Sequence, residues 1–138
     1  MTVEVVANPG EGEREAILRI LSAHNDAAVG STERRQVAIV VREETGTITG
    51  GLWGKIGYRW LFVEFLAVSP ERKRQGIGRD LMQRAEALAR EAGCIGIWLD
   101  TFSFQARGFY EKLGFAHFGT IDDFPPGHSR FFLSKRID

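Results

Sequence analysis

The segment Phe62–Gly78, which reads FVEFLAVSPERKRQGIG, constrains the fold more than any other part of the sequence. It begins as an apolar, β-rich run that ends at Ser69-Pro70, because proline cannot donate to a strand ladder. A short basic stretch follows, and two glycines then open a helix whose apolar residues recur every three or four positions. The pattern predicts a buried strand that runs through a short loop into a helix N-terminus.

Such a helix N-terminus is suited to binding an anion. The first backbone N–H groups of a helix have no internal partner, and glycines let a ligand approach them closely. Positive charge around the opening comes from Arg72, Lys73, Arg74 and Arg79. From the residues alone, the alternative is a turn that contains two glycines beside solvated basic side chains. The loop matches neither a nucleotide P-loop, which needs lysine and then serine or threonine after the glycines, nor the three-glycine dinucleotide motif.

Strands outnumber helices in the rest of the chain. Helical spacing of Ile17, Ile20 and Leu21 predicts a first helix, and two more helices are predicted at Gly76–Ala92 and near Phe104–Leu113. The β-rich runs predict strands at Val3–Ala7, Gln36–Arg42, Thr47–Lys55, Trp60–Val68, Ile95–Thr101, Phe115–Ile121 and Arg130–Lys135. Only the middle of the chain forms a strand–helix–strand unit. We therefore expect an α/β fold of the α+β type, with a mixed sheet flanked by helices.

Composition narrows the class of protein. A chain of 138 residues is the size of one domain, which we expect to span residues 1–138. Lysine plus arginine and aspartate plus glutamate each number 18, and this balance argues against a dedicated nucleic-acid binder. No apolar run reaches the roughly 20 residues of a membrane span, and the acidic N-terminus differs from a secretory signal. The single cysteine, Cys94, fits no disulfide or metal-ligand spacing, so a cytoplasmic protein is expected.

Two motifs in the chain resemble those of the GNAT superfamily of N-acetyltransferases. The stretch VSPERKRQGIG resembles the acyl-CoA pyrophosphate motif R/Q-x-x-G-x-G/A, which falls on Lys73, Gly76 and Gly78. The superfamily pattern N-x-x-A-x-x-x-Y falls on Ser103 through Tyr110, and the order of elements is similar along essentially the whole chain. Two residues depart from the motifs. Lys73 replaces arginine or glutamine but keeps a positive charge, and Ser103 replaces an asparagine that hydrogen-bonds the cofactor arm.

The resemblance implies a GNAT-like, mostly antiparallel sheet of about six to seven strands, and acetyl-CoA as the acyl donor without a metal. An amine would attack the thioester directly in a ternary complex. The backbone near Leu66 would pair with the pantetheine arm and hydrogen-bond the reacting carbonyl oxygen. The implied cofactor-binding residues are Leu66, Ala67, Val68, Lys73, Arg74, Gln75, Gly76, Ile77, Gly78, Arg79, Ser103 and Tyr110.

Tyr110 is the first candidate catalytic residue. It matches the superfamily position that protonates the departing thiolate, a general-acid role. The alternative is plain packing, because Tyr110 also belongs to a helical apolar stripe with Ala106, Phe109 and Leu113.

Glu64 is the second candidate, because it is the only charge in an apolar strand and an unpaired buried carboxylate is costly. Strict alternation places it on the same face as Phe62 and Leu66, unless a bulge intervenes. In related small-molecule acetyltransferases an acid at this offset lines the acceptor site, where it would bind the amine or take its proton. The alternative is an ion pair with Lys55 or Arg59.

The acceptor site is less constrained by the sequence. Trp53 and His128 are candidates for its walls, although strand aromatics usually belong to a core and turn histidines are usually only exposed. The acids Glu64, Asp122 and Asp123 favour a small cationic or antibiotic-like amine as the partner, rather than nucleic acid or a membrane. Alternatives are a protein lysine or N-terminus as the acceptor, a non-catalytic acyl-CoA-binding module, and a nucleotide-phosphate binder. A homodimer is common in the superfamily.

Overall fold

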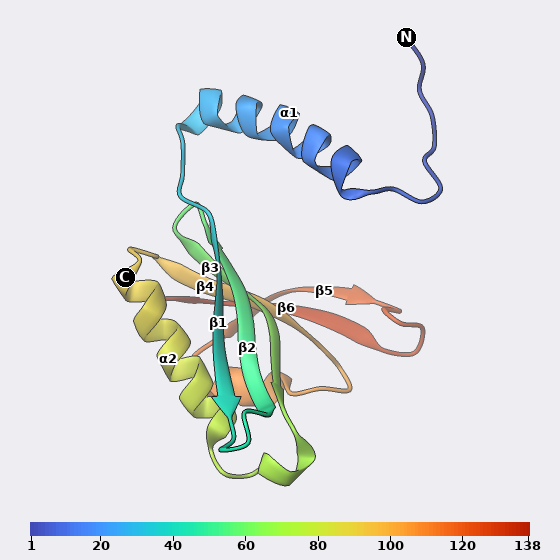
Figure 1. Ribbon diagram of the computed structural model, residues 1–138. Helices are drawn as coiled ribbons and strands as arrows, with labels where there is room; N and C mark the ends of the chain where they lie inside the picture. Colours follow the sequence, from blue (N-terminus) through green and yellow to red (C-terminus); the bar gives the residue numbers. More distant parts are fainter. The chain divides into compact units, whose positions relative to one another are not determined.

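The chain divides into an N-terminal unit, Met1–Thr32, and a sheet-forming unit, Glu33–Asp138, in the computed structural model, which describes all 138 residues (Figure 1). The N-terminal unit contains one helix, α1 (Glu11–Val29), so the predicted first helix is confirmed. Glu11 and Glu13 place negative charge at its positive end. Gly30 ends it with a φ of 81° and donates its N–H to the Asp26 carbonyl at 2.9 Å. No helix of the protein is both long and apolar enough to cross a membrane.

The predicted strand at Val3–Ala7 is wrong. These residues form no helix or strand, and all of them are exposed. Their apolar side chains resemble those of a strand, but the N-terminal unit contains no other strand that could pair with their backbone. An extended segment without a partner leaves its N–H and C=O groups to water and is not a stable strand by itself.

Six strands form one sheet: β1 (Arg35–Arg42), β2 (Ile48–Gly57), β3 (Trp60–Val68), β4 (Gly96–Phe102), β5 (Ala116–Asp122) and β6 (Ser129–Arg136). The strand order is β1-β2-β3-β4-β6-β5. Only β3 and β4 are parallel, and helix α2 (Ile77–Glu91) makes the crossover between them. The predicted mixed, mostly antiparallel sheet flanked by helices is therefore confirmed, with six strands.

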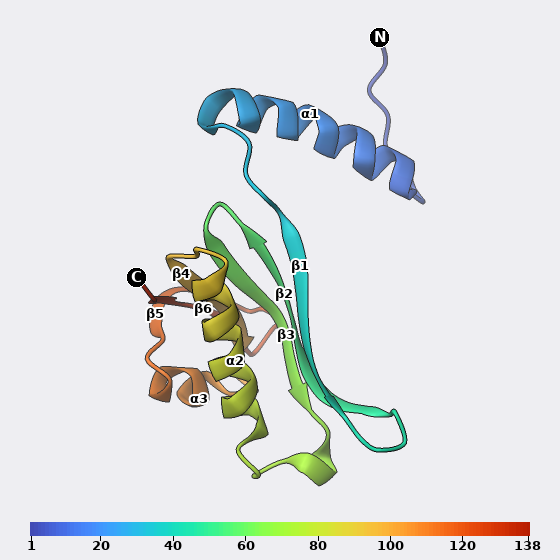
Figure 2. The same ribbon diagram turned by 60° about the vertical axis from the view of Figure 1, so that its left-hand side comes forward.

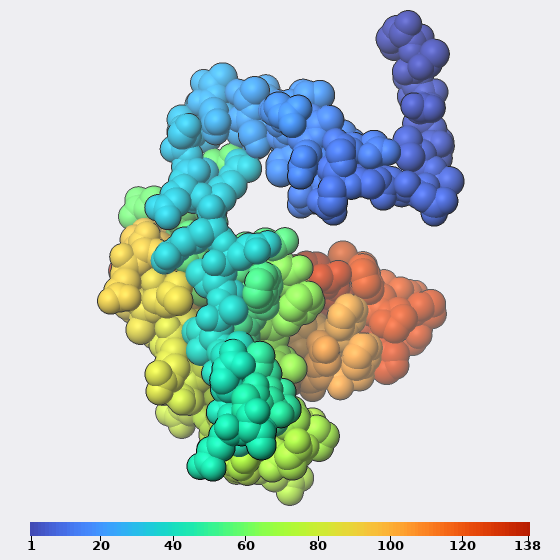
Figure 3. Space-filling view, viewed as in Figure 1, coloured from blue at the N-terminus to red at the C-terminus, as the bar shows by residue number.

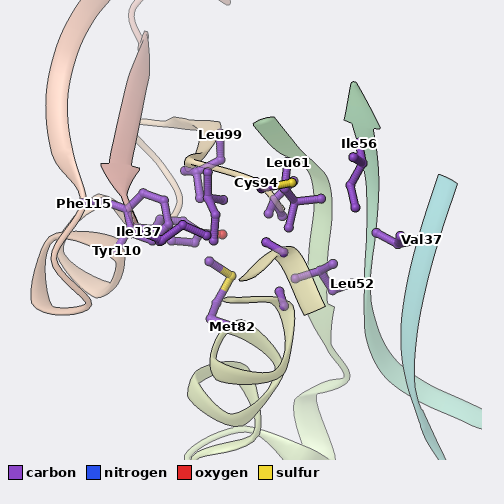
Figure 4. Close-up of a cluster of buried hydrophobic side chains, with 14 of the residues drawn as sticks. Val37, Leu52, Ile56, Leu61, Met82, Cys94, Leu99, Tyr110, Phe115 and Ile137 are labelled. Carbon is purple, nitrogen blue, oxygen red and sulfur yellow. The ribbon is translucent and has the colours of Figure 1, made fainter. Parts of the chain in front are cut away.

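Helix α2 packs on one face of the sheet (Figure 2). Its buried residues, Leu81, Met82, Ala85 and Ala89, recur at helical spacing, as the sequence predicts. Figure 4 shows Met82 pointing toward the apolar side chains of the central strands. The largest fully buried side chains are Leu61, Ile97, Leu99 and Leu133. Burial of each contributes roughly 1.5–3 kcal/mol, which holds the central strands and α2 in one layered unit.

The short helix α3 (Arg107–Lys112) is shorter than the predicted Phe104–Leu113. The first part of the predicted helix is instead a turn, in which the Gln105 N–H donates to the Phe102 carbonyl at 2.9 Å. The other end agrees with the sequence, because Gly114 follows with a φ of 95°. The turn places Phe104 and Gln105 directly after β4, beside the region described next.

Candidate functional site

A cleft opens where β3 and β4 diverge. The two strands pair only from Trp60 and Gly96 to Val63 and Leu99, whereas β3 continues to Val68 and β4 to Phe102. The resulting cavity is about 730 Å³. Residues 64–68 of β3 line it, as do Lys73 and Gly78 from the next loop and helix, and Thr101, Phe104, Gln105, Ala106, Phe109 and Tyr110 from the β4–α3 region. The strand, loop and helix singled out from the sequence therefore meet in one cavity.

A β-bulge at Glu64 sets which side chains face this cleft. Trp53 pairs with Phe65 and Gly54 pairs with Val63, so Glu64 has no partner on β2. The simple alternation that places Glu64 and Leu66 on one face is therefore wrong. Leu66 packs against the core, whereas the Glu64 carboxylate lies 3.4 Å from the Lys55 ammonium. The ion pair with Lys55, expected as the alternative role of Glu64, is present, and Glu64 also lines the cleft.

The free edge of β3 presents backbone groups to the cleft. The Ser69 N–H donates to the Thr49 carbonyl on β2 at 2.8 Å. Alternate residues of an antiparallel strand bond to the same neighbour, so Ala67 also bonds toward β2, whereas Leu66 and Val68 direct their N–H and C=O groups the other way. No strand pairs with that other edge beyond Val63. Leu66 and Val68 thus provide free donors and acceptors along one wall of the cleft, where an extended chain could bind as an added strand.

The N-terminus of α2 forms the other end of the cleft. Gly76 is the residue before the helix and adopts a left-handed φ of 75°. A glycine has no side chain that could cap the helix, and no side-chain capping bond is present. The first amides of α2 are therefore not capped by a side chain and are available to an anion. Gly78 lies so close to α3 that a Cβ there would be 3.3 Å from the Phe109 ring. Lys73 brings a positive charge to the cleft lining.

The other basic and loop residues predicted for this end are placed differently. Arg79 lines a separate cavity of about 230 Å³ with Lys112, between α2 and α3. The Gln75 amide donates to the Glu71 carbonyl at 3.3 Å. The cleft lining does not include Arg74, Gln75 or Ile77. Any contact of these residues with a ligand in the cleft would be made by their backbone.

Arg72 is also not free to bind a ligand, because it makes two hydrogen bonds with Glu43, at 2.6 and 2.7 Å. The pair joins the loop after β3 to the β1–β2 hairpin, and Figure 3 shows these segments in contact at the bottom of the view. The Arg72 bonds, followed by one from Thr49, hold the pKa of Glu43 below its ordinary value. This pair fixes the position of the loop that leads to α2.

We predict that Glu43→Gln lowers the melting temperature slightly at about pH 7 and by less at about pH 3. A carboxylate whose pKa is lowered on folding stabilises the protein above its unfolded pKa, and this contribution disappears as the pH falls through the folded value. Thermal unfolding of both proteins across this range measures the difference. A melting-temperature difference that is the same at both pH values would contradict the expected role of the charged pair.

Tyr110 packs in the core and also reaches the cleft. It is 8% exposed and packs edge-on against Phe109 and Phe115, with ring centroids 5.0 and 6.1 Å away. Figure 4 shows it within the buried cluster. It also lines the cleft. Burial, and then the nearby charge of Asp100, raise the pKa of Tyr110 to about 12, so its hydroxyl is protonated at neutral pH and able to donate a proton.

Ser103 and His128 lie next to each other but do not line the cleft. Ser103 Oγ accepts a hydrogen bond from the Ser129 N–H at 3.0 Å and lies 3.2 Å from His128 Nδ1. These contacts join the β4–α3 turn to the β5–β6 loop. The His128 ring in turn packs edge-on against Phe104, which does line the cleft. Ser103 and His128 therefore support a cleft wall instead of forming its surface.

Several residues that line the cleft were not predicted from the sequence. Phe65 is 63% exposed there, and its cross-strand neighbour Trp53, which was expected at the acceptor site, is not part of the lining. In an apolar strand Phe65 is indistinguishable from a core residue until the bulge is known. Thr101 and Gln105 were also missed, although Gln105 stands two residues after the Ser103 position of the second motif.

Comparisons with known proteins agree with this geometry. The sequence profile of the acetyltransferase (GNAT) family matches residues 10–115. An acetyltransferase of Agrobacterium fabrum is 35% identical over 134 residues, which are 96% of this chain and 98% of that protein. The blasticidin-S acetyltransferase of Streptomyces morookaense is 42% identical over 95 residues, or 68% of this chain and 70% of that protein. A crystal structure of an acetyltransferase from Agrobacterium tumefaciens, 33% identical, covers 99% of this chain and 100% of its own with a TM-score of 0.93. The chain belongs to the acetyltransferase (GNAT) family and is an acetyltransferase.

Proposed function

We propose that this protein transfers the acetyl group of acetyl-CoA to a primary amine on a small cationic molecule. The observation that supports the proposal most is the combination of an unpaired strand edge and an uncapped helix N-terminus in one cleft. The pantetheine arm of CoA is an extended chain with two amide groups, which suits the free N–H and C=O groups of Leu66 and Val68. Its pyrophosphate suits the amides at the start of α2, with Lys73 nearby.

The chemistry needs two groups of this chain beside the bound cosubstrate, which supplies an acetyl thioester. The Leu66 N–H is directed away from β2 and would donate a hydrogen bond to the thioester carbonyl oxygen as it gains negative charge, a contact worth roughly 100- to 1,000-fold in rate. Tyr110 would donate its proton to the departing sulfur. The acceptor would attack the thioester carbon directly in the ternary complex as a neutral amine. The C–S bond breaks as the sulfur takes the Tyr110 proton, the new amide nitrogen releases its extra proton to solvent, and Tyr110 regains a proton from solvent, so no covalent bond to the protein is required.

A small cationic acceptor is supported by Glu64. Its carboxylate lies at the bulge of β3 and lines the cleft, with Lys55 beside it as a half-exposed ion-pair partner. An ammonium group of the acceptor would bind there through a charge-assisted hydrogen bond. The likeness to blasticidin-S acetyltransferase supports an antibiotic-like amine in particular. The single domain over residues 1–138, the cytoplasmic location and the homodimer stay predictions.

The proposal is tested by measuring thiol release from acetyl-CoA with a panel of cationic, neutral and peptide amines. We expect turnover on a small cationic amine, and we expect Glu64→Gln to raise the KM for this amine by about 10-fold, the value of one charge-assisted hydrogen bond. Lys55→Met is the matched control, because it removes the same ion pair and leaves the carboxylate in the cleft. It should leave the KM unchanged or lower it.

Three outcomes would contradict parts of the proposal. If CoA stabilises the protein but no amine is acetylated, the non-catalytic CoA-binding module is favoured. Turnover on peptide amines alone would make the acceptor a protein. An equal rise in KM for Glu64→Gln and Lys55→Met would mean that Glu64 acts only through its ion pair.

A further inference from the structure

We propose that Gln105 donates the side-chain amide hydrogen bond to the pantetheine arm that the resemblance assigned to the Ser103 position. The inference rests on the proposed function, because it requires CoA in the cleft. The ligand group is an amide carbonyl of the arm, which only accepts hydrogen bonds. A glutamine NH₂ group is a suitable donor, and it supplies the amide that Ser103 lacks.

The orientation of the Gln105 side chain is determined by two hydrogen bonds. Its Oε1 accepts from the Phe102 N–H at 2.8 Å and from Thr101 Oγ1 at 3.2 Å. A backbone N–H only donates, so the atom facing Phe102 must be the oxygen. Both bonds use the oxygen, which leaves the NH₂ group of Gln105 to donate elsewhere.

The residues that hold the Gln105 side chain are themselves fixed in position. Thr101 is 2% exposed in β4, and its Oγ1 also accepts from the Ala106 N–H at 3.5 Å. The Gln105 N–H closes a turn onto the Phe102 carbonyl at 2.9 Å. A long side chain on an exposed turn ordinarily loses much conformational entropy when it binds a ligand. Gln105 has already lost part of that freedom, which favours a specific binding role.

Position in the cleft distinguishes Gln105 from Ser103. Gln105 lines the cavity from the β4–α3 side, whereas β3 lines it with the free groups of Leu66 and Val68. The hydroxyl of Ser103 is bonded to the Ser129 N–H and to His128, outside the cavity lining. An extended arm bonded along one edge to β3 would have carbonyl groups left for a donor on the facing wall, and Gln105 offers an amide donor there.

Calorimetric titration of the purified full-length chain with CoA tests this role without requiring turnover. Gln105→Glu keeps an oxygen for Phe102 and Thr101 but removes the donating NH₂ group, and it should raise the Kd for CoA by about 10-fold. Gln36→Glu makes the same chemical change at an exposed position of β1 and should leave the Kd unaltered. The nucleotide half of CoA, without the pantetheine arm, should bind wild type and Gln105→Glu equally.

The outcomes separate this inference from the proposed function. Wild type that does not bind CoA would overturn the proposed function itself. The Gln105 inference alone is wrong if wild type and Gln105→Glu bind CoA equally well. It is also wrong if Ser103→Ala weakens CoA binding as much as Gln105→Glu does. A third contrary outcome is that Gln105→Glu weakens binding of the nucleotide half as much as it weakens binding of CoA. The substitution would then act through its charge or through distortion of the loop, and not through the pantetheine arm.

Discussion

Tyr110→Phe is expected to lower kcat by roughly 10- to 1,000-fold, within the range of general acid–base catalysis. The variant keeps the ring that packs against Phe109 and Phe115, so the core around it is preserved. It removes only the hydroxyl, which would protonate the departing CoA sulfur. The KM for acetyl-CoA should change much less than kcat, because the lost interaction forms mainly in the transition state. Steady-state kinetics with the best amine of the panel, together with thermal unfolding, separate these effects.

Tyr58→Phe is the matched control, because Tyr58 is the only other tyrosine in the chain. Its hydroxyl accepts a hydrogen bond from Arg34 at 2.6 Å in the turn between β2 and β3, away from the cleft lining. This variant should turn over like wild type. Unchanged kcat in Tyr110→Phe, or an equal loss in Tyr58→Phe, would rule out the acid role of Tyr110.

The pH dependence of the Tyr110 effect follows from its raised pKa. Burial and the charge of Asp100 raise the pKa of Tyr110 to about 12, so the hydroxyl keeps its proton throughout the range in which the enzyme is assayed. The ratio of wild-type to Tyr110→Phe turnover should therefore stay constant from about pH 7 to about pH 10. A ratio that falls toward one over this range would mean that the hydroxyl loses its proton in that range, contrary to this pKa.

The parts of this site that sequence alone predicted depend on local chemistry. Proline at position 70 ends β3, Gly76 adopts the left-handed φ before α2, and the apolar spacing of α2 places its buried face against the sheet. Each of these properties is determined by residues close together in the chain. The loop and the helix were therefore predictable before any tertiary contact was known.

The predictions that failed concern residues whose partners are distant in the sequence. The bulge at Glu64 depends on how β2 and β3 pair, and Arg72 bonds to a glutamate 29 residues earlier. The Ser103 hydroxyl is held by Ser129, which is 26 residues later. Val3–Ala7 shows the opposite case, in which a local strand pattern found no strand to pair with. Side-chain roles at the site therefore required the folded structure, even though the residues carrying the motifs did not.

Gly78→Val is expected to weaken CoA binding by about 100-fold or more, the effect of losing two hydrogen bonds to a charged group. Gly78 is the second residue of α2, and its backbone amide is among those proposed to hold the pyrophosphate. A Cβ there would lie 3.3 Å from the Phe109 ring, and the two methyl groups of valine need further room beside the cleft. The helix itself is not weakened by the change, because valine has a higher helix propensity than glycine.

Gly108→Val separates an obstructed cleft from a general effect of valine in a helix. Gly108 is the second residue of α3, as Gly78 is of α2, but apart from its chain neighbours and the backbone of its own helix no atom lies within 4 Å of its Cβ position. Gly108→Val should therefore bind CoA like wild type, whereas Gly78→Val should lose both CoA binding in calorimetry and the stabilisation by CoA in thermal unfolding. Normal CoA affinity in a folded Gly78→Val protein would mean that the pyrophosphate does not approach the start of α2. In that case the phosphate site, and with it the direction of the cosubstrate along β3, would have to be assigned elsewhere.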